Sequence, residues 1–168
     1  MVRDGPSLVV ALLLQCLHGR SDPAQLGMTP SSAPRDVRGH IEGSVYRAAI
    51  GHSEIYKFVS LNDPGGEDDH DCGIAVFHAD STVYIRDVLS MLKSERWKYS
   101  VVRRRRPTDD GVGETIVLRG PGKAGNGRVT IMSLPPNWRS VPSILLSKNL
   151  QEALAPYADL KIFQIYNP

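Results

Sequence analysis

Residues 80–106 read DSTVYIRDVLSMLKSERWKYSVVRRRR, and this stretch decides the fold class because it joins the clearest helix of the chain to a strand. Asp80, Ser81 and Thr82 are all good N-cap residues, so a helix is expected to begin there. Apolar side chains then recur at i, i+3, i+4 and i+7, with charged residues on the opposite side. These apolar residues are Ile85, Val88, Leu89 and Leu92. The spacing predicts an amphipathic helix that packs on a sheet.

The strand after this helix carries the most informative charge pattern of the sequence. Residues 97–102 alternate, with Trp97, Tyr99 and Val101 on one face, and four arginines follow, Arg103, Arg104, Arg105 and Arg106. Aromatic rings interleaved with cations can stack bases while arginine neutralises phosphates. The alternatives are a core strand that runs into a solvated basic loop, a localisation signal, or contact with an anionic membrane surface. Because neighbouring side chains of a strand point to opposite faces, at most half of the arginines join one patch, unless the ladder ends before Arg105.

Further strands and a second helix are expected on both sides of this segment. β-Branched and aromatic residues between turn signals predict strands at 41–50, 54–61, 73–79, 114–119 and 128–134. A helical apolar stripe over about 142–157 and a last strand at 160–166 follow. The pattern predicts the α+β class, with a single domain over 40–168 in which two amphipathic helices pack on an antiparallel or mixed sheet of about five to seven strands. The sequence shows no internal repeat.

The chain before residue 40 divides into an apolar segment and a polar arm. Residues 1–20 contain the run LVVALLL at 8–14, which is far shorter than the ~20 apolar residues of a membrane span. Two interpretations stay open for it: a secretory signal peptide with a basic Arg3, or an amphipathic or buried helix capped by Ser7. Residues 21–39 are rich in Pro, Ser and Gly without an apolar period, which predicts a flexible arm.

Overall composition and cysteine content bear on the compartment more than on the partner. The net charge of +2 is too small to indicate a ligand, and 41% of hydrophobic residues excludes wholesale disorder. Cys16 and Cys72 cannot form the disulfide framework of a small secreted domain, and no spacing resembles a zinc site. This favours a reducing compartment. An intracellular location, cytoplasmic or nuclear, is therefore expected, and secretion is the alternative if residues 1–20 are a signal peptide.

The Gly-rich loop 120–127 (GPGKAGNG) invites a phosphate-loop interpretation, which its spacing does not support. The motif needs a Gly five residues before the Gly-Lys pair and a Ser or Thr after the Lys, and both are missing. We expect a mobile hairpin tip that carries Lys123 between Arg119 and Arg128. Such a tip could still contact a polyanion.

No residue pattern points to a metal or to catalysis. The acidic loop 67–72 starts like a calcium loop, but no downstream Glu completes it, which predicts a solvated turn. Four histidines lack an accompanying nucleophile elbow or metal-binding helix motif; they are His40, His52, His70 and His78. His78 ends an apolar strand and is expected to be a hydrogen-bonded core histidine. The sequence therefore predicts no metal, no cofactor and no enzymatic activity.

The function expected from these patterns is non-enzymatic binding of nucleic acid, RNA included, or of another polyanion by an Arg-rich surface. The residues expected to form that surface are Arg96, Lys98, Arg103, Arg104, Arg105, Arg106, Lys123 and Arg128. One alternative is a protein-interaction or assembly subunit of structural or matrix type, for which the arm is a docking segment. A second alternative is a secreted small module. No transmembrane segment is expected, whereas peripheral membrane contact stays open.

Overall fold

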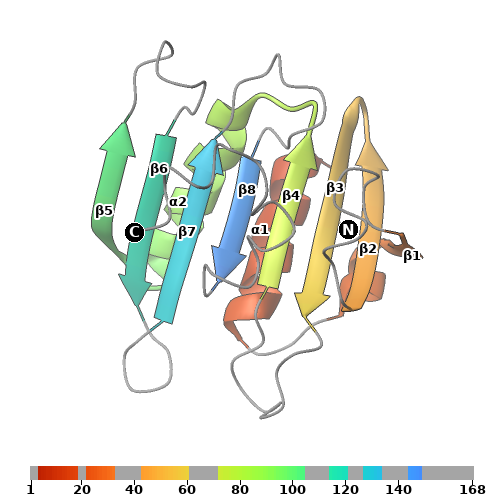
Figure 1. The fold of residues 1–168 in the computed structure, drawn as a ribbon, viewed down its shortest axis with the longest axis horizontal. Coiled ribbons are helices and arrows are strands. Elements are labelled where there is room, and N and C mark those ends of the chain that lie inside the picture. Colours follow the sequence, from red (N-terminus) through yellow and green to blue (C-terminus); the bar gives the residue numbers. More distant parts are fainter. Residues whose placement is uncertain are drawn as a thin grey trace.

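The computed structural model describes residues 4–18, 22–32, 43–60, 72–104, 114–120, 127–133 and 144–148 (Figure 1). Within these ranges the chain forms two α-helices, one short 3-10 helix and eight strands. In chain order they are α1 (Gly5–Leu17), η1 (Pro23–Leu26), β1 (Thr29–Ser31), β2 (Gly43–Ile50), β3 (Ser53–Ser60), β4 (Cys72–Phe77), α2 (Ser81–Ser94), β5 (Lys98–Arg104), β6 (Glu114–Gly120), β7 (Gly127–Ser133) and β8 (Ile144–Lys148).

The described strands form one antiparallel sheet in the order β1-β2-β3-β4-β8-β7-β6-β5. β1 and β5 lie at its edges, and β4 pairs with β8 at its centre (Figure 1). An antiparallel sheet with two helices confirms the α+β class predicted from the sequence. The sheet has eight strands, more than expected, because residues 29–31 and 144–148 form strands that the sequence patterns did not predict.

The architecture repeats although the sequence does not. Each half of the described chain is a helix followed by four antiparallel strands, α1 with β1 to β4 and α2 with β5 to β8. In each half the strand order runs inward from one edge of the sheet. The halves meet where β4 pairs antiparallel with β8. One sheet therefore joins two units of the same element order.

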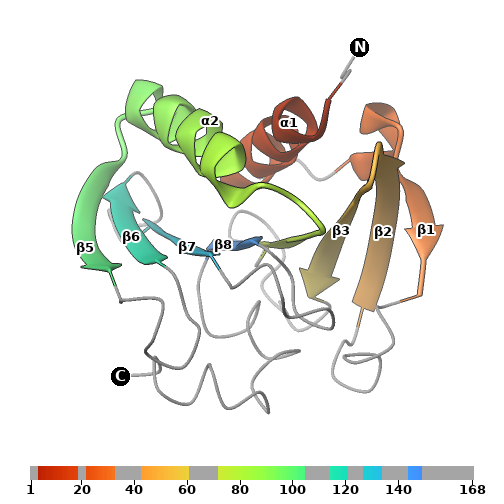
Figure 2. The ribbon, with the colours of Figure 1, turned by 90° about the horizontal axis from the view of Figure 1, so that it is seen from above.

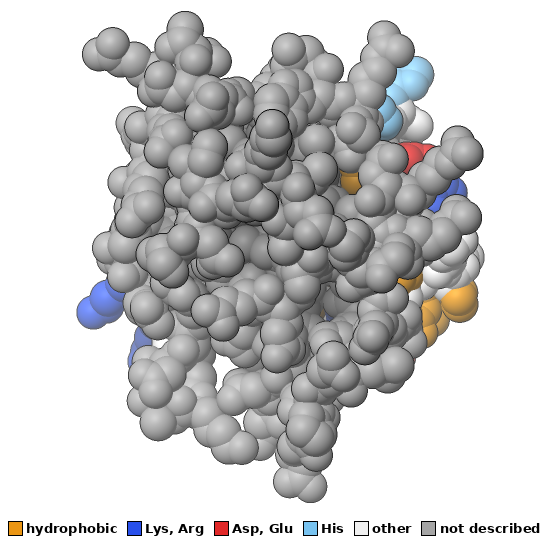
Figure 3. All heavy atoms as spheres, in the orientation of Figure 1, with side chains coloured by type: hydrophobic (Ala, Val, Ile, Leu, Met, Phe, Trp, Pro, Cys, Tyr) orange, Lys and Arg blue, Asp and Glu red, His pale blue; other side chains and the backbone are white. Residues whose placement is uncertain are grey.

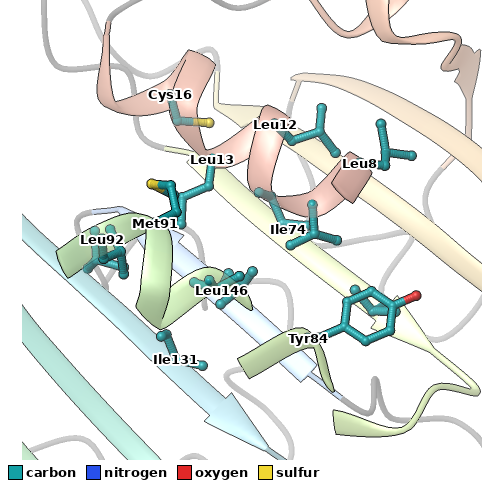
Figure 4. Packing of buried hydrophobic residues seen from close by; sticks show 14 of the residues in the cluster. Leu8, Leu12, Leu13, Cys16, Ile74, Tyr84, Met91, Leu92, Ile131 and Leu146 are labelled. Carbon is teal, nitrogen blue, oxygen red and sulfur yellow. The ribbon is translucent and has the colours of Figure 1, made fainter. Parts of the chain in front are cut away.

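Both helices lie on the same face of the sheet, and the hydrophobic core fills the space between the two layers (Figure 2). Apolar side chains from α1, α2 and the central strands meet there (Figure 4). Those that are at most 1% exposed include Leu8, Leu12, Leu13, Ile55, Ile74, Leu92, Ile131 and Leu146. Leu89, which was expected on the core face of its helix, is only partly buried, whereas Leu92 is fully buried.

α1 places the apolar N-terminal run inside the core. Its N-cap is Asp4, whose carboxylate accepts a hydrogen bond of 2.7 Å from the backbone N–H of Ser7. This hydrogen bond lowers the pKa of Asp4. The expected cap at Ser7 is therefore wrong. Within the described ranges, neither helix has the length and apolarity to cross a membrane. An export role for the segment stays a prediction.

The beginning of the second predicted helix is a strand. Residues 144–148 form β8, which pairs with β4 on one side and with β7 on the other. A short apolar run fits a buried strand or a buried helix equally well, and here two flanking strands decide between them. The prediction of a helix from about 142 is wrong for these five residues. The remainder of that helix and the strand at 160–166 lie outside the described residues.

Regular structure also replaces part of the expected arm. Asp22 caps η1, since its side chain accepts a hydrogen bond of 3.3 Å from the Gln25 backbone N–H. Gly27, with a φ of 83°, ends η1 in the left-handed conformation that glycine adopts readily. β1 then pairs with β2, with Thr29 opposite Arg47. The expectation of a structureless arm is thus wrong for residues 22–32, and residues 33–40 lie outside the described ranges.

Candidate functional site

Two of the predicted site residues lie at the corner where α2 turns into β5. Arg96 is exposed in the turn, and Lys98 is exposed as the first residue of β5. Between them Trp97 is only 6% exposed and belongs to the core. In the space-filling view, Lys and Arg side-chain atoms project near the start of β5, at the lower left (Figure 3). The corner therefore anchors one aromatic ring inside and presents two cations outside.

The sheet register extends this basic corner across three strands. Lys98 of β5 stands opposite Arg119 of β6, and Arg119 stands opposite Arg128 of β7. Residues directly opposite one another share a face of a sheet, and neighbouring strands lie ~4.8 Å apart. Strand alternation puts these positions on the face opposite the helices, because Leu118 and Val129 face the core. We call Lys98, Arg119 and Arg128 the basic row.

No acidic residue accompanies the basic row in the described strands. The described residues two positions away along the chain are Arg96, Ser100, Val117 and Thr130. Like charges directly opposite one another destabilise a sheet. The register therefore makes the basic row a candidate position for an anion.

The other predicted arginines lie elsewhere. Arg103 and Arg104 are the last two residues of β5, so Arg104 lies about 20 Å from Lys98 at ~3.3 Å per residue. In the register, Arg104 stands opposite Glu114 and Arg103 stands opposite Thr115. The remaining predicted site residues, Arg105, Arg106 and Lys123, fall outside the described part of the chain. The described residues of the predicted surface thus lie at two separate places. Arg96, Lys98 and Arg128 are near the start of β5, and Arg103 and Arg104 are at its end.

Trp97 does not take the base-stacking role that the sequence suggested. It is buried, and a side chain at Gly120 would overlap its indole ring. Gly120 is therefore needed beside the ring, and the contact fixes the ends of β5 and β6 next to the basic row. The alternation expected from Trp97 to Val101 is interrupted after Tyr99, because the register shifts at a bulge between Tyr99 and Val101.

Arg119 is a candidate that sequence reasoning noticed but did not include in the site. Its signal was present: Arg119 and Arg128 flank the Gly-rich loop at equal distances from its ends, and Gly120 pairs with Gly127. A symmetric hairpin loop sets its flanking residues opposite each other. The sequence did not reveal that this register continues to β5, where Lys98 stands opposite Arg119.

Arg47, by contrast, has an acidic partner within the protein. Arg47 of β2 forms a salt bridge with Glu54 of β3, and hydrogen bonds to Glu54 and to Tyr56 raise its pKa. Tyr56 in turn meets Phe77 edge-on, with ring centroids 5.6 Å apart. The charge of Arg47 is satisfied within the protein, so this end of the sheet offers less to an external anion.

One lysine is buried under the helices. Lys57 of β3 is 1% exposed and stands opposite Ile74 and Tyr46 in neighbouring strands. Burial lowers the pKa of Lys57 to about 8, and the charge of Asp22 opposes that shift only in part. The side chain is therefore inaccessible to an external ligand. Its buried charge affects the stability of the fold and does not belong to the basic surface.

Cys16 of α1 is disulfide-bonded in the structure, and Cys72 at the start of β4 is the only other cysteine of the sequence. The bond therefore gives α1 a covalent cross-link. The two cysteines indeed give no framework of several bridges, but they do give one bridge. Disulfides persist mainly in oxidising compartments.

The histidines that the structure describes do not assemble a site. His18 contacts Glu95 at 3.1 Å, which links the ends of the two helices. His78 is exposed at the bend after β4, with a φ of 57°, so the expectation of a core histidine is wrong. Among the described residues no group of three or more His, Cys, Asp or Glu side chains could hold a metal. The acidic loop at 67–71 lies outside the described ranges.

No protein-family model, curated protein or solved structure matches the chain.

Proposed function

We propose that this chain is a single-domain, non-enzymatic binding protein that holds a polyanion on the basic row, with nucleic acid as the first candidate ligand. The observation that supports this function is the register, which aligns Lys98, Arg119 and Arg128 on three neighbouring strands without an acidic residue beside them. Repulsion between cations in such a row lowers the stability of the protein without a ligand, and a bound anion would relieve that repulsion.

The chemistry of the row suits phosphates. Arginine forms bidentate hydrogen bonds with phosphate oxygens, and lysine adds a compact charge. Binding energy comes mainly from the release of counterions when phosphates are neutralised. Phosphate contacts position a ligand without reading its sequence, and Trp97 is buried instead of free to stack bases. We therefore expect affinity that falls steeply with salt and shows little sequence preference.

The experiment compares two pairs of substitutions in the full chain. In Lys98→Gln with Arg119→Gln, two cations of the row are neutralised. In Arg47→Gln with Arg86→Gln, two cations that have acidic partners are neutralised, Glu54 and Asp87 respectively. Binding of a fluorescent oligouridylate is followed by anisotropy over a range of salt concentrations. The slope of log affinity against log salt should fall by ~1.4–1.8 for the first pair, since each lost phosphate contact contributes ~0.7–0.9.

Equal slopes for the two pairs would contradict the proposal, because the effect would then reflect total charge and not the row. A third pair, Arg103→Gln with Arg104→Gln, tests the far end of β5. A large slope change only in that pair would move the site to the arginine run.

Assembly with another protein is the second candidate, and the position of β5 favours it. β5 ends the strand order of the described sheet, and an edge strand of seven residues can accept a partner strand through its backbone. Binding of this kind would resist salt, unlike polyanion binding. Retention of a protein partner at high salt, with no nucleic acid present, would make assembly the better assignment.

The disulfide at Cys16 favours an oxidising compartment but opposes a cleaved signal peptide at residues 1–20. Cytosolic thiols are kept reduced, whereas exported proteins keep their disulfides. Cleavage of residues 1–20 would remove Cys16 and the bond with it, so export and loss of this segment are incompatible with a disulfide-bonded domain. Intact-mass spectrometry of native protein separates the cases, since it reports both the N-terminus and the loss of two hydrogens on oxidation. A reduced protein with both cysteines present would support the intracellular location.

A further inference from the structure

The corner between α2 and β5 has a glycine-type conformation at an arginine. α2 ends with Ser94, Glu95 is its C-cap, and Arg96 follows with a φ of 67°. The Arg96 N–H donates to the Lys93 carbonyl at 3.1 Å, and the Trp97 N–H donates to the Leu92 carbonyl at 2.9 Å. These two bonds define a Schellman motif, whose left-handed position is usually glycine and sometimes asparagine.

The chain uses glycine at comparable described positions. Gly27 ends η1 with a φ of 83°, and Gly51 forms the β2–β3 turn with a φ of 61°. His78 is the other described non-glycine residue with a positive φ, and histidine is among the types enriched in that region. Arginine is not among them, so Arg96 carries a backbone cost that a glycine would remove.

The described contacts of the Arg96 side chain do not offset this backbone cost. A cation near a helix C-terminus favours the helix dipole, but Lys93 already occupies the last turn of α2. The anchoring of the corner depends on Trp97, which packs against Gly120, and not on the exposed side chain of Arg96. Arg96 does lie beside the basic row, since it precedes Lys98 by two residues. The two hydrogen bonds of the motif fix its backbone there.

We infer that Arg96 is a phosphate-contacting residue, presented beside the basic row by a corner that gives up stability in order to keep an arginine where glycine folds better. This inference rests on the proposed polyanion binding. A rigid corner fixes the root of the guanidinium before the ligand arrives, which reduces the entropy lost on binding. Strained residues that the surrounding structure over-determines gather at functional sites for this reason.

The test is a substitution that moves stability and binding in opposite directions. In the full chain, Arg96→Gly should raise Tm by ~2–4 °C, the shift expected when about one left-handed-residue penalty is removed in a protein of this size. The same variant should bind fluorescent oligouridylate more weakly, with a salt slope lower by ~0.7–0.9 for one lost phosphate contact. Arg96→Lys keeps the charge and the strain, so it should leave Tm unchanged and keep the wild-type slope.

Lys98→Gln is measured alongside, and it separates this inference from the proposed function. If Lys98→Gln weakens binding and Arg96→Gly does not, Arg96 is not a ligand contact, although the row is. If neither variant changes binding, the row itself is not the site and both proposals fall. A lower Tm for Arg96→Gly would also overturn the inference, because the arginine would then stabilise the corner instead of straining it.

Discussion

The two halves of the sheet share an element order and differ in where they keep their charges. In the first half, α1 is almost wholly apolar and carries a disulfide at Cys16, Lys57 is buried, and Arg47 is paired with Glu54. In the second half, α2 is amphipathic, and cations stand in register across β5, β6 and β7 without an acidic neighbour among the described residues.

We interpret this difference as a division in which the first half stabilises the fold and the second half is available for binding. The first half also buries side chains on the sheet face away from the helices, where Val45, Tyr56 and Phe77 are each at most 8% exposed. Of its described cations, Lys57 is inside the protein and Arg47 is paired with Glu54. The second half leaves positive charge to be matched from outside. Changes in the first half should therefore lower stability, and neutralising the basic row should weaken binding without lowering stability.

The largest expected effect is the loss of α1. Full burial of one Leu or Val is worth ~1.5–3 kcal/mol, and Leu8, Val9, Leu12 and Leu13 are all at most 1% exposed. Their sum is comparable with the ~5–15 kcal/mol that stabilises a whole domain. A chain that starts after residue 20 should therefore show no cooperative thermal transition by circular dichroism. A cooperative transition in that truncated chain would mean that α1 is dispensable and that the first half is not the stabilising one.

Next in size is the disulfide. Cys16→Ser should lower the free energy of unfolding by ~2–4 kcal/mol, because the disulfide of Cys16 restricts the unfolded chain. Urea denaturation measures this difference, and reduction of the wild type should reproduce it. Polyanion affinity should not change. A weaker affinity in the reduced protein would couple the two halves and weaken the division between them.

Lys57 should make stability depend on pH. Its pKa is about 8 in the folded protein against 10.5 when unfolded, so between these values the unfolded chain binds more protons and stability rises with pH. The rise should total on the order of 3 kcal/mol at ~1.36 kcal/mol per pH unit, and below pH 8 the penalty is constant. Lys57→Met should be more stable at neutral pH and lack the rise. The exposed Lys93→Met is the control, and a rise that persists in Lys57→Met would assign it to another group.

The smallest expected effect belongs to the Arg47–Glu54 pair. Both side chains are more than a third exposed, so solvent screens their attraction. A double-mutant cycle with Arg47→Gln and Glu54→Gln should give a coupling of ~0.2–1 kcal/mol that declines with salt. No coupling at low salt would remove the matched cation from the comparison and leave only the buried lysine.

Local patterns were sufficient for the amphipathic helix and for most strands. The spacing of Val88 and Leu92 placed α2, and β-branched runs placed β2 to β7, because side chains near in sequence decide these elements. Residues 144–148 could not be placed in the same way. Their state depends on β4 and β7, which are distant in sequence, and a short apolar run is compatible with either state.

The candidate site was predictable in part. The basic character of Lys98 and Arg128 is visible in the sequence, but their alignment through Arg119 depends on the pairing of three strands. Trp97 shows the opposite case: an aromatic residue beside cations suggests stacking on bases, and only its contact with Gly120 shows that it is a core anchor. Charge is local information, whereas register and burial are not.

The central claim is that a polyanion contacts the second half at the basic row. The most direct measurement is a titration of the ¹⁵N-labelled full chain with oligouridylate, followed through backbone amide chemical shifts. The account predicts that the largest changes fall at Arg96, Lys98, Arg119 and Arg128, and that Arg47, Glu54 and Lys57 stay unchanged. Largest changes in β2 and β3, or none at the start of β5, would contradict it.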